Sequence, residues 1–267
     1  MESGEIKIEN IDNSVLRILT SMYQIGLFDN APSGNPLANV TSDAHNELAR
    51  KIAATSTVLA KNANDILPLE KSALGEYIAM FGDETTVSGG GSGHVTPAYT
   101  ITLAQGITNA LVGTSTEVIY NAGSNATEAT ALTQKCTYAV VVMATTSSEG
   151  SDRENLSLGN GQDELVTTVL AANPRTIVSV RSPGAVLMPW AAQVPAVLLS
   201  WLPGQEAGNA LADVLFDTVN PSARSPLTMP NKDNEVGFSK AEYRKEIVAQ
   251  TNSDSKLHYF VLLFVSL

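Results

Sequence analysis

From Tyr77 onward the chain alternates between short apolar runs and segments with helical spacing, and this alternation limits the folds it can adopt. Each apolar run has the length of a buried strand, and each helical segment is long enough to return the chain to the start of the next strand. Such βαβ units give a mostly parallel sheet. The expected strands are Tyr77–Phe81, Glu117–Tyr120, Tyr138–Ala144, Ile177–Arg181 and Ala196–Ser200.

Helical spacing between these runs predicts the connecting helices. One of them ends cleanly at Asn173-Pro174, because the residue before a proline disfavours helical backbone. The fold class expected is therefore α/β, with a mostly parallel sheet of about six strands sandwiched by helices on both faces. The expected helices are Thr100–Leu111, Thr127–Cys136, Gln162–Ala172, the short Val186–Ala192 and Gly208–Phe216.

The N-terminal part has a different organisation, with two helices separated by a proline-bearing stretch. Ile11–Tyr23 has helical spacing, Asn30–Asn39 carries two prolines and predicts an extended linker, and Ser42–Thr55 predicts a second helix with Leu48, Ile52 and Ala53 on its inner face. Val58–Leu59 is a short extended piece. We expect three parts: a helix and linker over residues 1–40, the α/β sandwich over 41–230, and an irregular or truncated extension over 231–267.

Charge and hydropathy exclude some classes of partner. The net charge is −11, with 27 acidic against 16 basic residues and no stripe of Lys or Arg, so no nucleic-acid binding is expected. No apolar stretch reaches the roughly 20 residues that span a bilayer, so no membrane partner is expected. The start, Met1–Asn10, lacks the pattern of a signal peptide, and the compartment is left open. The one cysteine, Cys136, predicts a packing role.

Four polar, glycine-rich loops follow the predicted strands. They are Gly82–His94, the loop that contains Glu149, Ser182–Gly184 and Trp201–Gly208. Because the carboxyl ends of parallel strands meet at one edge of a sheet, these loops are expected to converge where α/β proteins bind ligands. The glycine run at Gly89 does not fit a dinucleotide fingerprint, since His94 stands where its last glycine would be. No cofactor and no metal site is expected.

Glu149 follows the most apolar of the predicted strands and lies on a glycine-flexed loop. A carboxylate at this place can donate a proton, although most acid–base hydrolysis of a sugar bond needs a second carboxylate. A solvated side chain paired with Arg153 is an equally simple interpretation. Asp152 and Arg153 can also stabilise the loop itself. Trp201, on the same edge, could stack on a sugar or pack in the core.

The motifs in their order resemble the C-terminal α/β-sandwich domain of glycoside hydrolase family 3, the β-glucosidase and exo-glucanase family. The resemblance runs from about Ile11 to Tyr243. It departs from the family pattern at Leu59-Ala60-Lys61-Asn62 and at Asn220–Pro226. The motifs that carry it are His45 with Leu48-Ala49-Arg50, Val58–Asn62 with Leu67-Pro68-Leu69, Gly89–Gly93, Glu149–Arg153, Trp201–Gly208 and Asn220-Pro221-Ser222.

The resemblance implies one half of a retaining glycosidase. The family's N-terminal (β/α)8 barrel carries the aspartate nucleophile, and its sandwich domain supplies the acid/base glutamate, which matches Glu149 here. The implied substrate is a β-linked glucoside or oligosaccharide, with Gly91, Ser92, Asp152, Arg153 and Trp201 as binding residues. The implied partner is the barrel, and residues 1–40 are the helix and linker that leave it.

Two functions from different classes remain open for this chain. The first is the sandwich half of a β-glucosidase-like enzyme that hydrolyses O-glycosyl bonds. On this reading the isolated chain is inactive, because the nucleophile has no place in it. The resemblance is to a family that is often secreted, but the compartment of this chain is left open. The second is a non-catalytic domain that binds carbohydrate or a partner.

Overall fold

The computed structural model describes residues 6–30, 34–35, 38–233 and 235, and these divide between two compact units, Met1–Thr41 and Ser42–Leu267. The first unit contains one helix, α1 (Ile8–Gln24), longer at both ends than the predicted Ile11–Tyr23. No residue of α1 is buried, and Val15, Leu16 and Ile18 are exposed. The predicted extension over 231–267 lies mostly outside the described residues.

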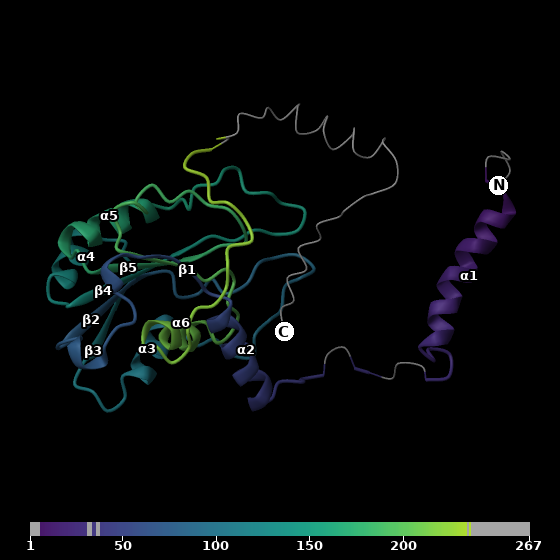
Figure 1. Ribbon diagram of the computed structural model, residues 1–267, viewed down its shortest axis with the longest axis horizontal. Helices are drawn as coiled ribbons and strands as arrows, with labels where there is room; N and C mark the ends of the chain where they lie inside the picture. The colour runs from purple at the N-terminus through teal and green to yellow at the C-terminus, as the bar shows by residue number, and fades with distance from the viewer. Residues whose placement is uncertain (1–5, 31–33, 36–37, 234, 236–267) are drawn as a thin grey trace. The chain divides into compact units, whose positions relative to one another are not determined.

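The second unit is built on a six-stranded sheet with the order β1-β6-β5-β4-β2-β3 (Figure 1). Five strands are parallel, and β1 alone is antiparallel, paired with β6. Both the strand number and the largely parallel pairing confirm the fold class expected from the alternation. The strands are β1 (Val58–Asn62), β2 (Tyr77–Gly82), β3 (Glu117–Asn121), β4 (Tyr138–Ala144), β5 (Thr176–Arg181) and β6 (Ala196–Leu199).

Helices cover both faces of the sheet (Figure 1). On one face α3 (Leu103–Ala110) and α2 (Asp43–Thr55) each pack against α6 (Ala207–Leu215). On the other face α4 (Ala126–Thr133) packs against α5 (Gln162–Ala172). The caps follow the local sequence: the Ser42 side chain accepts from His45 N, and Thr102 with Gln105 forms a capping box at α3.

Successive residues of each central strand enter different cores, because side chains alternate across a sheet. In β4, Val140 and Val142 belong to the cluster under α3 and α6, whereas Val141 and Met143 belong to the cluster under α5. A strand that is apolar on both faces is typical of a parallel sheet covered on both sides. The apolar run that identified β4 in the sequence therefore reflects two cores.

Helices α3 and α6 approach closely through two glycines. A Cβ on Gly106 would lie 2.0 Å from the carbonyl carbon of Gly208, and a Cβ on Gly208 would lie 1.9 Å from the Thr102 oxygen. The backbones are thus in contact, and neither position has room for a side chain. This contact holds the end of the long β2–α3 connection against the start of α6.

Two local expectations were wrong. Val186–Ala192 does not form a helix: Pro189 interrupts it, and turns begin at that residue. Val186 and Trp190 are buried in the core cluster under α5. In α2, Leu48 and Ile52 are 47% and 43% exposed. Ala53, the third residue of the predicted face, is buried as expected. Ala54 is also buried, and Arg50 of α2 binds Asp213 of α6 through its guanidinium.

Candidate active site

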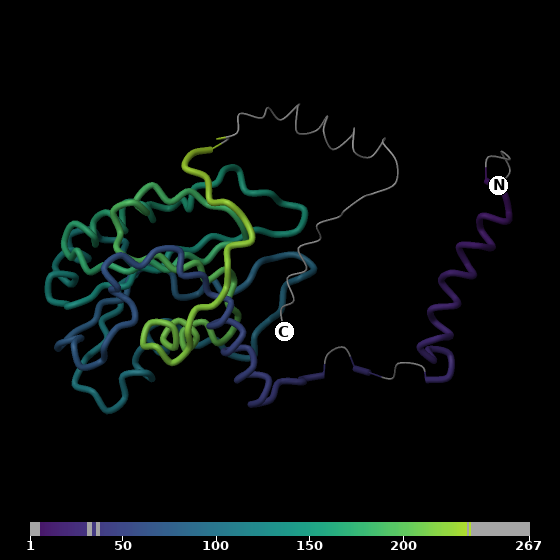
Figure 2. Tube along the Cα trace, in the orientation of Figure 1, coloured from purple at the N-terminus to yellow at the C-terminus, as the bar shows by residue number. Residues whose placement is uncertain are grey.

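The site lies at the point where the sheet changes winding direction. Strands β2 and β4 are neighbours, yet the chain leaves β2 toward α3 on one face and leaves β4 toward α5 on the other. Diverging connections of this kind open a crevice at the carboxyl ends of the strands. The glycine loop, residues 83–102, and the glutamate loop, residues 145–161, border it, and Figure 2 shows both leaving the same edge of the sheet.

The two loops are joined by backbone contacts at their tips. Gly90 N donates to Ser147 O at 2.9 Å, and Gly90 and Ser148 form an isolated parallel bridge. The Thr146 hydroxyl donates to Ser88 O at 3.3 Å. These bonds fix the glycine loop against the glutamate loop, and the sequence prediction that the loops converge holds for this pair.

The carboxylate of Glu149 is exposed, and both of its described hydrogen bonds come from Ser92. Ser92 N donates to Glu149 Oε2 at 3.0 Å, and the Ser92 hydroxyl donates to the same oxygen. Among the described residues no ion pair joins Glu149 to Arg153. The simple alternative of a Glu149–Arg153 pair therefore finds no support in this arrangement.

Gly91 gives Glu149 its place through the absence of a side chain. Gly91 has φ of +83°, in the left-handed region that favours glycine, and a Cβ there would lie 2.5 Å from Glu149 Cβ. By contrast, a Cβ on nearby Gly93 would meet nothing within 4 Å. The glycine run thus contains one position that the geometry of Glu149 requires.

An open groove of about 710 Å³ runs beside the glutamate loop. Arg153 and Asp152 line it, with Asp152 exposed and Arg153 half-buried. Arg153 Nη2 donates to Ala185 O at 2.7 Å, while its Nη1 is buried and has no hydrogen-bond partner in the part of the chain described. Burial lowers the pKa of Arg153 from its usual value. A buried charged donor without a hydrogen-bond partner is rare in a folded protein.

Trp201 lies apart from that groove lining. It has a positive φ of +54°, is half-buried and packs against the cluster under α5. Of the five predicted binding residues, then, Asp152 and Arg153 share the groove, Gly91 and Ser92 contact Glu149, and Trp201 contacts the core.

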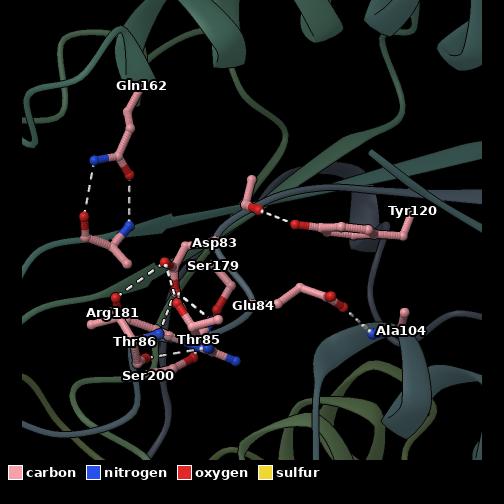
Figure 3. Close-up of polar contacts among 12 residues, drawn as sticks. Asp83, Glu84, Thr85, Thr86, Ala104, Tyr120, Gln162, Ser179, Arg181 and Ser200 are labelled. Atoms are coloured by element: carbon pink, nitrogen blue, oxygen red, sulfur yellow. Dashed lines mark hydrogen bonds and ion pairs between the residues drawn. The ribbon is translucent and has the colours of Figure 1, made fainter. Parts of the chain in front are cut away.

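Beneath the loops lies a polar cluster that the sequence did not indicate as part of the site (Figure 3). Arg181, at the end of β5, is 1% exposed; its Nη1 donates to Thr86 O at 3.3 Å and lies 3.9 Å from Asp83 Oδ1. Burial lowers the pKa of Arg181 to about 10, and the nearby Asp83 and Glu84 oppose that shift. In the sequence, the one sign of this cluster was a charged residue, Arg181, at the end of an otherwise uncharged strand.

The same cluster anchors the start of the glycine loop. Asp83 Oδ1 accepts from Thr85 N at 3.1 Å and from Thr86 N at 2.7 Å, and Glu84 Oε1 accepts from Ala104 N at 2.9 Å. On the β4 side, the Gln162 amide exchanges two hydrogen bonds with the backbone of Ala144 (Figure 3). Both loops therefore leave the sheet from fixed points.

Glu206, predicted to be structural, is 5% exposed at the start of α6. Its Oε1 accepts from the Tyr99 hydroxyl at 2.5 Å and its Oε2 from Asn209 Nδ2 at 2.7 Å. Burial, followed by the bond to Glu206, raises the pKa of Tyr99 to about 12. Cys136 is buried as expected, and burial raises its pKa to about 11. Neither carboxylate nor thiol is placed to meet a substrate.

The sequence model of the glycosyl hydrolase family 3 C-terminal domain matches residues 57–263, most of the chain. The chain belongs to this family. The match extends beyond Tyr243, where the resemblance expected from the motifs ended. Within the described residues, no helix is long and apolar enough to cross a membrane, and no group of three or more His, Cys, Asp or Glu could hold a metal ion.

Relatives of this family 3 domain include probable β-glucosidase L of Aspergillus terreus, 31% identical over 94% of this chain and 38% of its own length. Thermostable β-glucosidase B of Acetivibrio thermocellus is 33% identical over 87% of this chain and 32% of its own. The crystal structure of β-D-glucoside glucohydrolase from Trichoderma reesei is similar with a TM-score of 0.75, 30% identity, and coverage of 86% and 37%. The chain thus spans about a third of the length of these relatives.

Proposed function

We propose that this chain is the sandwich half of a retaining β-glucosidase and that Glu149 is its acid/base residue. One observation carries the proposal: an exposed carboxylate stands at the winding change of the sheet and is held there by the glycine loop. Sites in open α/β sheets form at this position. The family relatives named β-glucosidases support the reaction class.

In the complete enzyme a barrel aspartate attacks the anomeric carbon and the bond to the leaving oxygen breaks. Glu149 gives its proton to that oxygen in the same step. A water molecule then attacks the glycosyl ester, Glu149 takes the water's proton, and the aspartate leaves. The two carboxyl groups must lie about 5–5.5 Å apart for this retaining course. An exposed Glu149 can reach a carboxylate on a facing domain.

The groove beside Glu149 is proposed to receive part of a β-linked glucoside or oligosaccharide. Buried Arg153 Nη1 supplies a donor for a sugar hydroxyl, and Asp152 supplies an acceptor. Gly91 and Ser92 are proposed to border the sugar at the reacting end, where the absence of a side chain on Gly91 leaves room for Glu149. Trp201 is proposed to offer the exposed part of its ring to a sugar face.

The partner proposed for this chain is the family's (β/α)8 barrel, and the isolated chain is proposed to be inactive. Leu48 and Ile52, one helical turn apart on α2, present exposed apolar surface suited to a domain contact. The same surface supports the alternative, a non-catalytic domain that binds carbohydrate or a partner. Calorimetry of this chain with glucose and cello-oligosaccharides, together with aryl-glucoside assays on the chain alone and joined to a family 3 barrel, separates the alternatives. Binding without turnover in either form favours the second, and measurable hydrolysis in either form defeats it.

The test of Glu149 uses the chain joined to a family 3 barrel. Glu149→Ala is expected to lower kcat on an aryl glucoside with a good leaving group less than on one with a poor leaving group. Azide is expected to restore part of the turnover by replacing the missing base-assisted water. Loss of an acid/base residue costs about 10²–10⁴-fold.

Glu154, an exposed glutamate on the same loop, is the matched control. Glu154→Ala is expected to leave turnover near that of the unchanged protein. Full activity in Glu149→Ala would remove Glu149 from the mechanism.

A further inference from the structure

Ser92 contacts the two oxygens of the Glu149 carboxylate unequally. Its backbone N–H and its hydroxyl both donate to Oε2, and no described residue donates to Oε1. An oxygen that accepts from two donors is a poor site for a proton, because that proton would lie close to the hydrogens of both donors. The contact therefore distinguishes the two oxygens before any substrate binds.

We propose that Ser92 is a positioning residue for Glu149, which holds Oε2 as the unprotonated oxygen and leaves Oε1 as the atom that carries and transfers the proton. This inference rests on the proposed function of Glu149 and gives Ser92 a role that does not require contact with the sugar. During hydrolysis the proton leaves Oε1 for the leaving oxygen and returns to Oε1 from water, while Oε2 keeps its two donors throughout.

Backbone contacts around Ser92 fix its position against the Glu149 carboxylate. Gly90 is bonded to Ser147 and bridged to Ser148, so the glycine loop and the glutamate loop are joined two residues before Ser92 and one residue before Glu149. Gly91, with φ of +83°, turns the chain so that the next N–H points at the carboxylate. The Ser92 hydroxyl then adds a second donor from the same residue.

Two donors on one oxygen also stabilise the ionised form of the carboxylate. An acid/base residue must be protonated when substrate arrives and ionised when water attacks, so its pKa has to lie near the working pH. The charged or titratable neighbours are Asp152, Arg153 and Glu154 on the same loop, His94 on the glycine loop, and Asp233 across the groove. None of these is hydrogen-bonded to Glu149 in the structure, and all of them remain when Ser92 is changed.

The direct test is a carboxyl ¹³C NMR titration of the full chain with labelled glutamate, with Glu149→Gln identifying the Glu149 signal. In Ser92→Ala the pKa of Glu149 is expected to rise by about half a unit to one unit, because one donor to the ionised form is lost. Ser92→Thr keeps the hydroxyl and is expected to restore the original titration.

The matched control is Ser148→Ala, because the Ser148 hydroxyl donates to the backbone oxygen of Glu149 at 3.4 Å and not to its carboxylate. This variant is expected to leave the Glu149 titration unchanged. A Glu149 pKa in Ser92→Ala equal to that of the unchanged chain would overturn the proposal, and so would an equal rise in Ser148→Ala.

In the form joined to a barrel, the alkaline limb of the pH profile of kcat/KM reports the protonated acid. A higher Glu149 pKa in Ser92→Ala moves that limb to higher pH by the shift seen in the titration. The titration requires no turnover, so its result does not depend on whether Glu149 acts in catalysis. A confirmed titration shift beside full activity of Glu149→Ala would keep the Ser92 contact and reject the proposed function.

Discussion

At the scale of single residues, the absence of a side chain on Gly91 matters to the site as much as the presence of Glu149. Gly91 lets the glycine loop pass against Glu149, whereas Gly93 has open space around it. The family resemblance implied that Gly91 is a substrate-binding residue. The structure shows that the closest approach at Gly91 is to Glu149 itself, a distinction that composition and spacing do not contain.

Gly91→Ala is expected to displace Glu149 and reduce kcat of the barrel-joined protein by about 10²-fold, the effect of misplacing a reacting group by an ångström. The new Cβ would lie 2.5 Å from Glu149 Cβ, and the positive φ adds strain. Gly93→Ala, which meets nothing, is the control and should keep its activity. Steady-state kinetics on an aryl glucoside compares the two. Equal activities would show that the loops adjust freely.

At the scale of elements, charge selects which face of a helix is buried. Helical spacing in Ser42–Thr55 favoured a face with Leu48 and Ile52, but α2 instead turns Arg50 toward α6. Arg50 makes two hydrogen bonds to Asp213, at 2.5 and 2.6 Å, and the Asp213 side chain is 7% exposed. That bond, with a smaller Coulombic contribution, raises the pKa of Arg50. A buried carboxylate needs such a partner, and this need outweighs apolar periodicity.

Arg50→Ala is expected to lower the free energy of unfolding by about 1–3 kcal/mol, because it leaves Asp213 without its charged partner. The value lies below that of a fully buried pair, since the Arg50 side chain is 42% exposed. Lys51→Ala, at the neighbouring exposed position of α2, is the control and should change stability by less than about 0.5 kcal/mol. Urea unfolding of the full chain measures both. Similar losses in the two variants would contradict a specific role for the pair.

At the scale of the whole molecule, the chain carries apolar surface that its own sandwich does not cover. Leu48 and Ile52 are exposed although they have the spacing of a helix face that packs. The chain spans little more than a third of the length of two of its β-glucosidase relatives. The proposed barrel contact gives this surface a partner.

The double variant Leu48→Glu with Ile52→Glu is expected to leave the thermal midpoint of the isolated chain nearly unchanged, because both side chains are already in water. In a mixture with a separately produced barrel domain, the same variant should weaken association at least tenfold, since two charges would be buried without partners. Calorimetry measures both. Leu59→Glu, on β1 at 37% exposure, tests whether any new charge has this effect. Undiminished association would place the contact elsewhere.

Periodicity, helix caps and proline predicted all five strands of the alternation, most of the helices and the loop that carries Glu149. These are local properties, set by residues a few positions apart. Three features could be seen only in the folded chain. Strand β2 lies beside β4, which brings Ser92 to Glu149. Arg181 is buried below the loops, and Arg50 rather than Leu48 faces α6 from α2. Such contacts join residues far apart in the chain, so they arise from strand order and packing, which no local pattern specifies.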